Sequence, residues 1–114
     1  MNLIITLNKN KTMEQFDTVT YQEKISEDKL TLVKYNASWC GPCRSLSPII
    51  EGIIKNYPDI NAGEVDIDTH SNLAIRDGVR GVPTIIFYKN GVALDRMVGL
   101  HPSHVYTQKI ESLK

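Results

Sequence analysis

The hydrophobic pattern changes its period at a Cys-Gly-Pro-Cys run about a third of the way along the chain. Before this run, the apolar residues from position 30 to 37 predict a β-strand. After it, residues 43–57 carry apolar side chains at the three- and four-residue spacing of one buried helix face. Pro48 should kink this helix and Pro58 should end it. A strand that leads directly into a helix favours an α/β fold, in which helices cover a sheet.

The rest of the chain continues this alternation. We expect strands at residues 3–7, 61–68, 84–89 and 92–98, and helices at 12–19 (capped by Thr12), 71–77 and 102–113. Asn90-Gly91 is typical of a type I′ turn, so the strands on either side of it should form an antiparallel hairpin. Gly78 should end the helix before it. The polar segment 20–29 has no pattern that decides its state. This order predicts an α/β sandwich with a mixed sheet, formed by a single domain over residues 1–114.

Charge and hydropathy exclude several classes of partner. Thirteen basic residues balance thirteen acidic ones, so no excess of positive charge indicates binding to nucleic acid. No apolar run reaches the length needed to cross a membrane. The short apolar stretch near the N-terminus has no basic flank before it and no small-residue cleavage site after it, unlike a secretory signal. We therefore expect a cytoplasmic monomer with neither nucleic-acid nor membrane partners.

Cys40 and Cys43 are the only cysteines, so each has only the other as a partner within the chain. A bond between them would close a loop too small to stabilise the fold appreciably, and a Cys-x-x-Cys pair between a strand and a helix is typical of reversible dithiol–disulfide chemistry. At the start of the helix, Cys40 would have its thiolate stabilised by free backbone N–H groups and the helix dipole. An unperturbed thiol has a pKa of about 8.5, so a lower value makes Cys40 reactive at neutral pH. Cys43, one turn inside the helix, is suited to resolving a mixed disulfide formed by Cys40.

Two other interpretations of the cysteines are weaker. A structural zinc site needs about four ligands, and one Cys-x-x-Cys pair supplies two. His70, His101 and His104 do not complete a usual zinc-finger spacing. Two inert core cysteines would not usually lie on a Gly-Pro turn beside a tryptophan. We therefore expect neither a metal nor a bound cofactor.

The run Trp39-Cys40-Gly41-Pro42-Cys43 resembles the active-site signature of the thioredoxin family. Further matches are Pro48, the loop Arg80-Gly81-Val82-Pro83-Thr84, the Asn90-Gly91 turn and Gly99, so the resemblance covers nearly the whole chain. It implies the thioredoxin fold, a three-layer sandwich with a central mixed sheet flanked by helices. It also implies a protein-disulfide reductase in which Cys40 is the nucleophile and Cys43 the resolving thiol. Its partners would be disulfide-containing client proteins and a thioredoxin reductase that donates electrons.

The same resemblance implies a groove for partner proteins, with Pro83 in a cis peptide bond beside the cysteines. A cis bond before proline costs far less than other cis bonds, and its turn would leave the backbone N–H and carbonyl of Val82 free for an extended peptide. The alternative for Pro83 is a trans proline that begins a strand. The groove would be lined by Trp39, Gly41, Pro42, Ile67, Gly81, Val82, Pro83, Val98 and Gly99.

The chain departs from the family pattern at three positions. Lys34 stands where the family usually has a buried aspartate, and Glu64 stands where it usually has a lysine on the neighbouring strand. A charge within an apolar strand needs a partner or water. We expect Glu64 to pair with Lys34 and to accept a proton from Cys43, while Lys34 favours the thiolate. The alternative is that Lys34 extends its ammonium to the surface. Asn36 replaces a frequent tryptophan, and its amide needs hydrogen bonds there.

Two other functions are compatible with this sequence. One is a thiol oxidase or isomerase, which Lys34 would favour because a nearby cation stabilises the reduced pair. The other is a binding subunit that uses the Trp39–Val82–Gly99 surface without redox turnover. The Gly-Pro dipeptide between the cysteines resembles reductases, so we expect a reductase.

Overall fold

The structure is a computed structural model that describes residues 12–114. Its strands are β1 (Glu14–Gln15), β2 (Thr31–Asn36), β3 (Asn61–Asp66), β4 (Thr84–Lys89) and β5 (Val92–Val98). Its helices are α2 (Thr18–Ile25), α3 (Gly41–Ile54), α4 (Ser71–Arg76) and α5 (Ser103–Leu113). The strand expected at residues 3–7 lies outside the described residues. Within the described chain, no helix combines the length and apolar character needed to cross a membrane.

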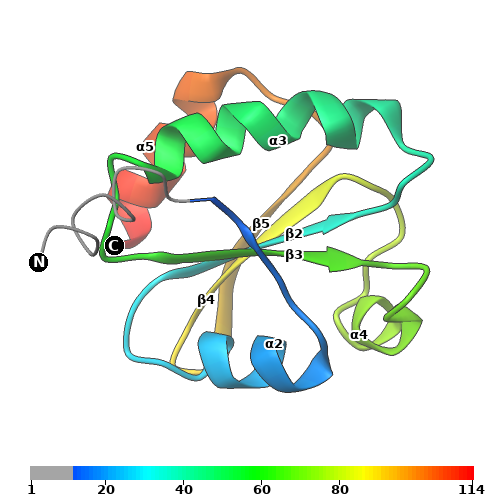
Figure 1. The fold of residues 1–114 in the computed structure, drawn as a ribbon. Helices are drawn as coiled ribbons and strands as arrows, with labels where there is room; N and C mark the ends of the chain where they lie inside the picture. The colour runs from blue at the N-terminus through cyan, green and yellow to red at the C-terminus, as the bar shows by residue number, and fades with distance from the viewer. Residues whose placement is uncertain (1–11) are drawn as a thin grey trace, which may run out of the picture.

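The five strands form one mixed sheet in the order β1-β3-β2-β4-β5. β3 runs parallel to both β1 and β2, whereas β4 is antiparallel to both β2 and β5. Helices α3 and α5 cover one face of the sheet, and α2 and α4 cover the other (Figure 1). The predicted sandwich with a central mixed sheet is therefore confirmed.

The start of the described chain differs from the prediction of a helix at residues 12–19. Met13 and Phe16 are both buried, but they belong to the clusters on opposite faces of the sheet. A three-residue interval places two side chains on one face of a helix, but on opposite faces of a strand. The chain therefore forms the edge strand β1, with Met13 on one face of the sheet and Phe16 on the other. Helix α2 begins only after Asp17, whose side chain accepts a hydrogen bond from the Thr20 amide at 2.8 Å.

Phe16 packs where β3 has no side chain. A Cβ atom added to Gly63 would lie 2.2 Å from the ring of Phe16, closer than two carbon atoms can approach. The absence of a side chain at position 63 thus lets the aromatic ring lie directly on the backbone of β3 beside the two-residue strand β1.

The remaining elements follow the prediction with shifted ends. The undecided segment 20–29 contains most of α2. Helix α3 begins at Gly41 rather than at position 43, continues through Pro48, and ends at Ile54, before Pro58. Helix α5 begins at Ser103 with Pro102 as its N-cap. Asn90 and Gly91 have φ angles of 53° and 78°, as the predicted type I′ turn requires.

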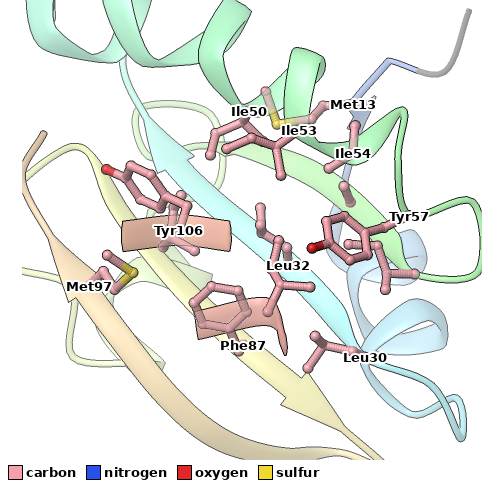
Figure 2. Packing of buried hydrophobic residues seen from close by; sticks show 14 of the residues in the cluster. Met13, Leu30, Leu32, Ile50, Ile53, Ile54, Tyr57, Phe87, Met97 and Tyr106 are labelled. Carbon is pink, nitrogen blue, oxygen red and sulfur yellow. The ribbon is translucent and has the colours of Figure 1, made fainter. Parts of the chain in front are cut away.

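The larger apolar core lies between the sheet and the helices α3 and α5. Figure 2 shows Ile50, Ile53 and Ile54 of α3 packing toward Leu32 of β2 and Phe87 of β4. Each such side chain contributes about 1.5–3 kcal/mol when it is fully buried. A second cluster, which includes Tyr21, Tyr35 and Tyr88, fills the space under α2 and α4. The two clusters fix β2 from both faces, and β2 leads directly into the cysteine turn.

Candidate active site

Cys40 and Cys43 are joined by a disulfide bond at the start of α3. Cys40 is the N-cap residue, and its Sγ accepts a hydrogen bond from the backbone N–H of Cys43 at 3.2 Å. Cys40 is 5% exposed and Cys43 is 1% exposed. The first sulfur therefore lies where backbone N–H groups and the helix dipole stabilise a thiolate, and the second lies deeper.

The loop before β4 packs against this pair. The Val82-Pro83 peptide bond is cis, as the resemblance predicted. Val82 and Ile67 pack against the small cluster formed by Ala37, Cys40 and Cys43. The carbonyl of Pro83 accepts a hydrogen bond from the Gly99 amide at 2.8 Å. Residues far apart in the sequence therefore meet at the disulfide.

Trp39 lies on the surface beside the cysteines and is 65% exposed. Its indole Nε1 donates a hydrogen bond to Asp68 Oδ2 at 2.9 Å, which ties the turn before α3 to the segment after β3. Val98, at the end of β5, is 60% exposed and pairs with Thr84 beside Pro83. Of the other groove positions, Gly41 is partly exposed, and Pro42 and Gly81 are exposed. The predicted groove residues thus include exposed apolar side chains on segments that converge at the disulfide.

Lys34 is completely buried behind this surface, on the face of β2 that α3 covers. Its Nζ donates a hydrogen bond to Ser47 Oγ at 3.1 Å, and Ser47 Oγ donates to the carbonyl of Cys43 at 3.3 Å. A buried ammonium is thus connected through one hydroxyl to the backbone of Cys43.

Comparison with known proteins agrees with this geometry. The model of the family described as thioredoxin matches residues 12–112. The chain belongs to the thioredoxin family. It is 34% identical over 95 residues to Thioredoxin-1 of Saccharomyces cerevisiae, covering 83% of this chain and 87% of that one. It is 37% identical over 93 residues to a mitochondrial Thioredoxin-2 of Schizosaccharomyces pombe, covering 82% and 68% of the two chains. The crystal structure of thioredoxin from Trypanosoma brucei brucei superposes with a TM-score of 0.83 at 26% identity, over 92% of each chain.

Membership of the thioredoxin family fixes the class of chemistry. Thioredoxins are protein-disulfide oxidoreductases, and this chain has both the family's fold and its spaced cysteine pair. The protein is therefore a dithiol–disulfide reductase. The family also implies disulfide-containing client proteins and a thioredoxin reductase as partners.

The structure places Glu64 next to Lys34 without an ion pair between them. The two residues are register partners in the parallel strands β2 and β3. No ion pair of either residue occurs among the described side chains. Burial lowers the pKa of Lys34, and the charges of Glu64 and Glu51 oppose that shift only in part. The ammonium therefore stays inside the protein rather than reaching the surface, and its hydrogen bond goes to Ser47.

Asn36, whose amide was expected to need hydrogen bonds, leaves one of its polar atoms without a partner in the described part of the chain. Its Oδ1 is buried and lacks a hydrogen-bond partner among the described residues. An unsatisfied buried carbonyl costs about 1–3 kcal/mol, so this position lowers the local stability behind the site.

Two residues of the site were missed by the sequence analysis. Ser47 lies one turn after Cys43, and a serine in a helix gives no signal unless the position of α3 on β2 is known. Asp68 follows β3 in an exposed segment, and its contact with Trp39 spans 29 residues. Both depend on how separate elements pack, which the local sequence does not specify.

Proposed function

We propose that Cys40 is the attacking thiolate and Cys43 the resolving thiol of this reductase. The observation that carries this assignment is the position of Cys40 at the N-cap of α3, with the backbone N–H of Cys43 directed at its sulfur. The Cys40 thiolate attacks one sulfur of a client disulfide, forming a mixed disulfide and releasing the other client sulfur as a thiolate. The Cys43 thiolate then attacks Cys40 Sγ, which releases the second client sulfur and closes the Cys40–Cys43 bond. Two electrons pass to the client, and a thioredoxin reductase returns them.

We infer that clients bind along the surface of Trp39, Val82 and Gly99, together with the other predicted groove residues. Support comes from the exposed side chain of Trp39 beside the disulfide and from the contact of Val82 with the cysteine cluster. Among residues 12–114, the backbone of Val82 makes no hydrogen bond, so its N–H and carbonyl can pair with an extended client chain.

Lys34 and Glu64 are proposed to assist the cysteines electrostatically. The Lys34 ammonium is connected through Ser47 to Cys43, and a buried positive charge favours a nearby thiolate. Glu64, its register neighbour, is the proposed acceptor of the proton from Cys43. In Lys34→Ala the apparent pKa of the Cys40 thiol should rise, and the rate of disulfide reduction at neutral pH should fall. Lys55→Ala, which removes an exposed lysine from the end of α3, is the control. An unchanged thiol pKa in Lys34→Ala would exclude the electrostatic role.

The cysteine roles are tested with two single variants and one double variant. Cys40→Ser should abolish reduction of insulin by the protein with its reductase. Cys43→Ser should instead accumulate covalent mixed disulfides with clients, which mass spectrometry detects and thiol reduction releases. If Cys43→Ser captures no client while Cys40→Ser does, the two roles are reversed. If the biological function survives in Cys40→Ser/Cys43→Ser, the protein acts as a binding subunit.

The reduction potential of the pair separates a reductase from a thiol oxidase. After equilibration in thiol–disulfide buffers, alkylation of the free thiols gives the oxidised fraction. We expect a potential near the thioredoxin value of about −270 mV. A potential of about −180 to −120 mV, the range of isomerases and oxidases, would contradict the reductase assignment.

We further propose that the protein is a cytoplasmic monomer with neither nucleic-acid nor membrane partners. Its balanced charge supports the absence of a nucleic-acid partner. Sedimentation equilibrium should give the mass of one chain at micromolar concentration, and fractionation should recover the protein with the cytosol. Recovery in an organelle would overturn the assignment of compartment, and the similarity to a mitochondrial relative makes that measurement necessary.

A further inference from the structure

Three tyrosine hydroxyls converge on one carboxylate oxygen on the face of the sheet opposite Lys34. Tyr21 of α2, Tyr35 of β2 and Tyr88 of β4 all donate hydrogen bonds to Asp77 Oδ2. The bond from Tyr88 is 2.7 Å long, and the hydroxyl oxygens of Tyr21 and Tyr88 lie 3.1 Å apart. We call these four residues the tyrosine clasp.

The three tyrosines of the clasp are almost completely buried. Tyr21 and Tyr35 are 0% exposed and Tyr88 is 3% exposed. A buried hydroxyl without a partner is costly, and a carboxylate oxygen is the acceptor that binds hydroxyls most strongly. The three tyrosines come from three different elements, and Asp77 is the residue that ends α4. The clasp therefore fixes the end of α4 against α2, β2 and β4 at once.

The residues that follow Asp77 form the loop whose Val82 packs against the disulfide. Arg96 of β5 donates to the carbonyl of Asp77 at 2.7 Å and to that of Gly78 at 3.4 Å. Val79 and Val82 pack against the cluster that contains the three tyrosines, and Val82 also contacts the cysteine cluster. A continuous set of contacts thus connects Asp77 to the cysteines.

Between Val79 and Pro83, the backbone of this loop makes few hydrogen bonds. Within the described chain, the backbone of Arg80 and of Val82 forms no hydrogen bonds. At the far end, Thr84 Oγ1 donates to the carbonyl of Gly81 at 2.7 Å. The position of the segment 79–82 therefore depends on how firmly its first residues are held. The Val79 amide donates to the carbonyl of Ala74 at 2.9 Å, Arg96 binds the two carbonyls before it, and the side chain of Asp77 anchors them to the tyrosines.

We propose that Asp77 is a positioning residue for client binding, which holds the loop of Val82 and Pro83 in place through the tyrosine clasp. The inference rests on the proposed role of that loop in binding clients. A protein client must lie along the loop as an extended chain, whereas a small aromatic disulfide needs only access to the sulfur of Cys40. Loosening the clasp therefore weakens the reaction with proteins more than the reaction with small disulfides.

The test compares insulin with 5,5′-dithiobis(2-nitrobenzoate) as substrates of Asp77→Asn, which keeps the shape of the side chain and removes its charge. A misplacement of about 1 Å can reduce a rate by about a hundredfold, so we expect about a tenfold fall in the insulin kcat/KM relative to the small disulfide. The fall should lie mostly in KM. Asp95→Asn is the matched control, because it removes a carboxylate that pairs with Lys109 on the surface. This control should leave both reactions as in the wild type.

Tyr88→Phe removes one of the three donors and serves if Asp77→Asn does not fold. It should lower the same ratio by a smaller factor, while circular dichroism confirms the folded state. An unchanged ratio in the folded variants, or an equal fall for both substrates, would overturn the role of Asp77. Inactivity of the wild-type protein toward both substrates would instead overturn the proposed reductase function.

Discussion

Lys34 and Tyr35 are adjacent in β2, yet they belong to two charged sites that are held in opposite ways: the buried ammonium of Lys34 and the partly buried carboxylate of Asp77. On the α3 face, the Lys34 ammonium donates one hydrogen bond, to the neutral hydroxyl of Ser47. On the other face, one oxygen of Asp77 accepts hydrogen bonds from three tyrosines. A buried charge is stabilised in proportion to the hydrogen bonds that replace water. The carboxylate is therefore a structural anchor, whereas the ammonium remains poorly compensated directly behind the resolving cysteine.

The two regions also differ in how they respond to pH. Burial lowers the pKa of Lys34, so its charge destabilises the folded state below that pKa. Burial raises the pKa values of Tyr35, Tyr88 and Tyr21, so their neutral hydroxyls keep donating, and their contribution to stability is lost only as the pH rises above about 10. The tyrosine hydroxyls thus stay protonated near neutrality, whereas the free energy of the Lys34 site depends on whether its ammonium keeps its proton.

Removing the acceptor of the clasp should have the largest effect on stability. Asp77→Ala leaves three buried hydroxyls without their shared acceptor and should lower the free energy of unfolding by about 3 kcal/mol. Urea denaturation followed by circular dichroism measures this change. A loss no greater than that of the surface variant Asp95→Ala would show that the clasp is not an anchor.

The next largest loss of stability is expected from removing the hydroxyl of Ser47, the hydrogen-bond partner of the Lys34 ammonium. Ser47→Ala removes the only hydrogen bond of the Lys34 ammonium among the described residues and should cost about 2 kcal/mol. The same substitution in a Lys34→Met background should cost much less, because no buried charge then loses its partner. Equal losses in the two backgrounds would mean that Ser47 acts independently of Lys34.

Removing the ammonium itself should stabilise the protein. Lys34→Met keeps the apolar stem and should raise the free energy of unfolding at neutral pH by about 1.5 kcal/mol. Folding releases the Lys34 proton when the pH lies between the lowered pKa of the folded state and the unfolded value of 10.5. The wild type should therefore gain stability relative to the variant as the pH rises toward 10.5. Denaturation at several pH values measures the difference, and a constant gap would contradict the burial of a charged lysine.

The smallest effect is expected from single donors of the clasp. Tyr35→Phe should cost about 1 kcal/mol, because two donors still satisfy Asp77. The control is Tyr106→Phe, since the Tyr106 hydroxyl accepts from the His101 amide and donates to the Gly99 carbonyl, both neutral. That change should cost about 0.5 kcal/mol. A larger loss at Tyr106 than at Tyr35 would weaken the comparison between the two charges.

The parts of the molecule that local sequence could predict are those with an unambiguous period. The spacing after Cys43 indicated α3, and Asn90-Gly91 indicated the hairpin of β4 and β5. The interval between Met13 and Phe16 suits a helix as well as a strand that crosses the sheet, so β1 was wrongly expected to be helical.

In the site, too, local sequence predicted the features that lie close together in the chain and missed those that depend on packing. Cys40 and Cys43 are three residues apart, so their chemistry is apparent from the sequence. The bonds of Asp77 to Tyr21 and Tyr35 span 56 and 42 residues, and no local pattern announces them. Lys34 was recognisable as an unusual charge, but its partner depends on how α3 lies on β2.

The exposed position of Trp39 has an optical consequence. It is the only tryptophan, it lies beside the disulfide, and three of the five tyrosines belong to the clasp on the far face. Indole emission therefore reports oxidation and occupancy at the cysteines, whereas the near-ultraviolet absorbance of the neutral tyrosines reports mainly on the opposite layer. Each region thus carries its own intrinsic chromophore, and light can follow the two separately in the unlabelled protein.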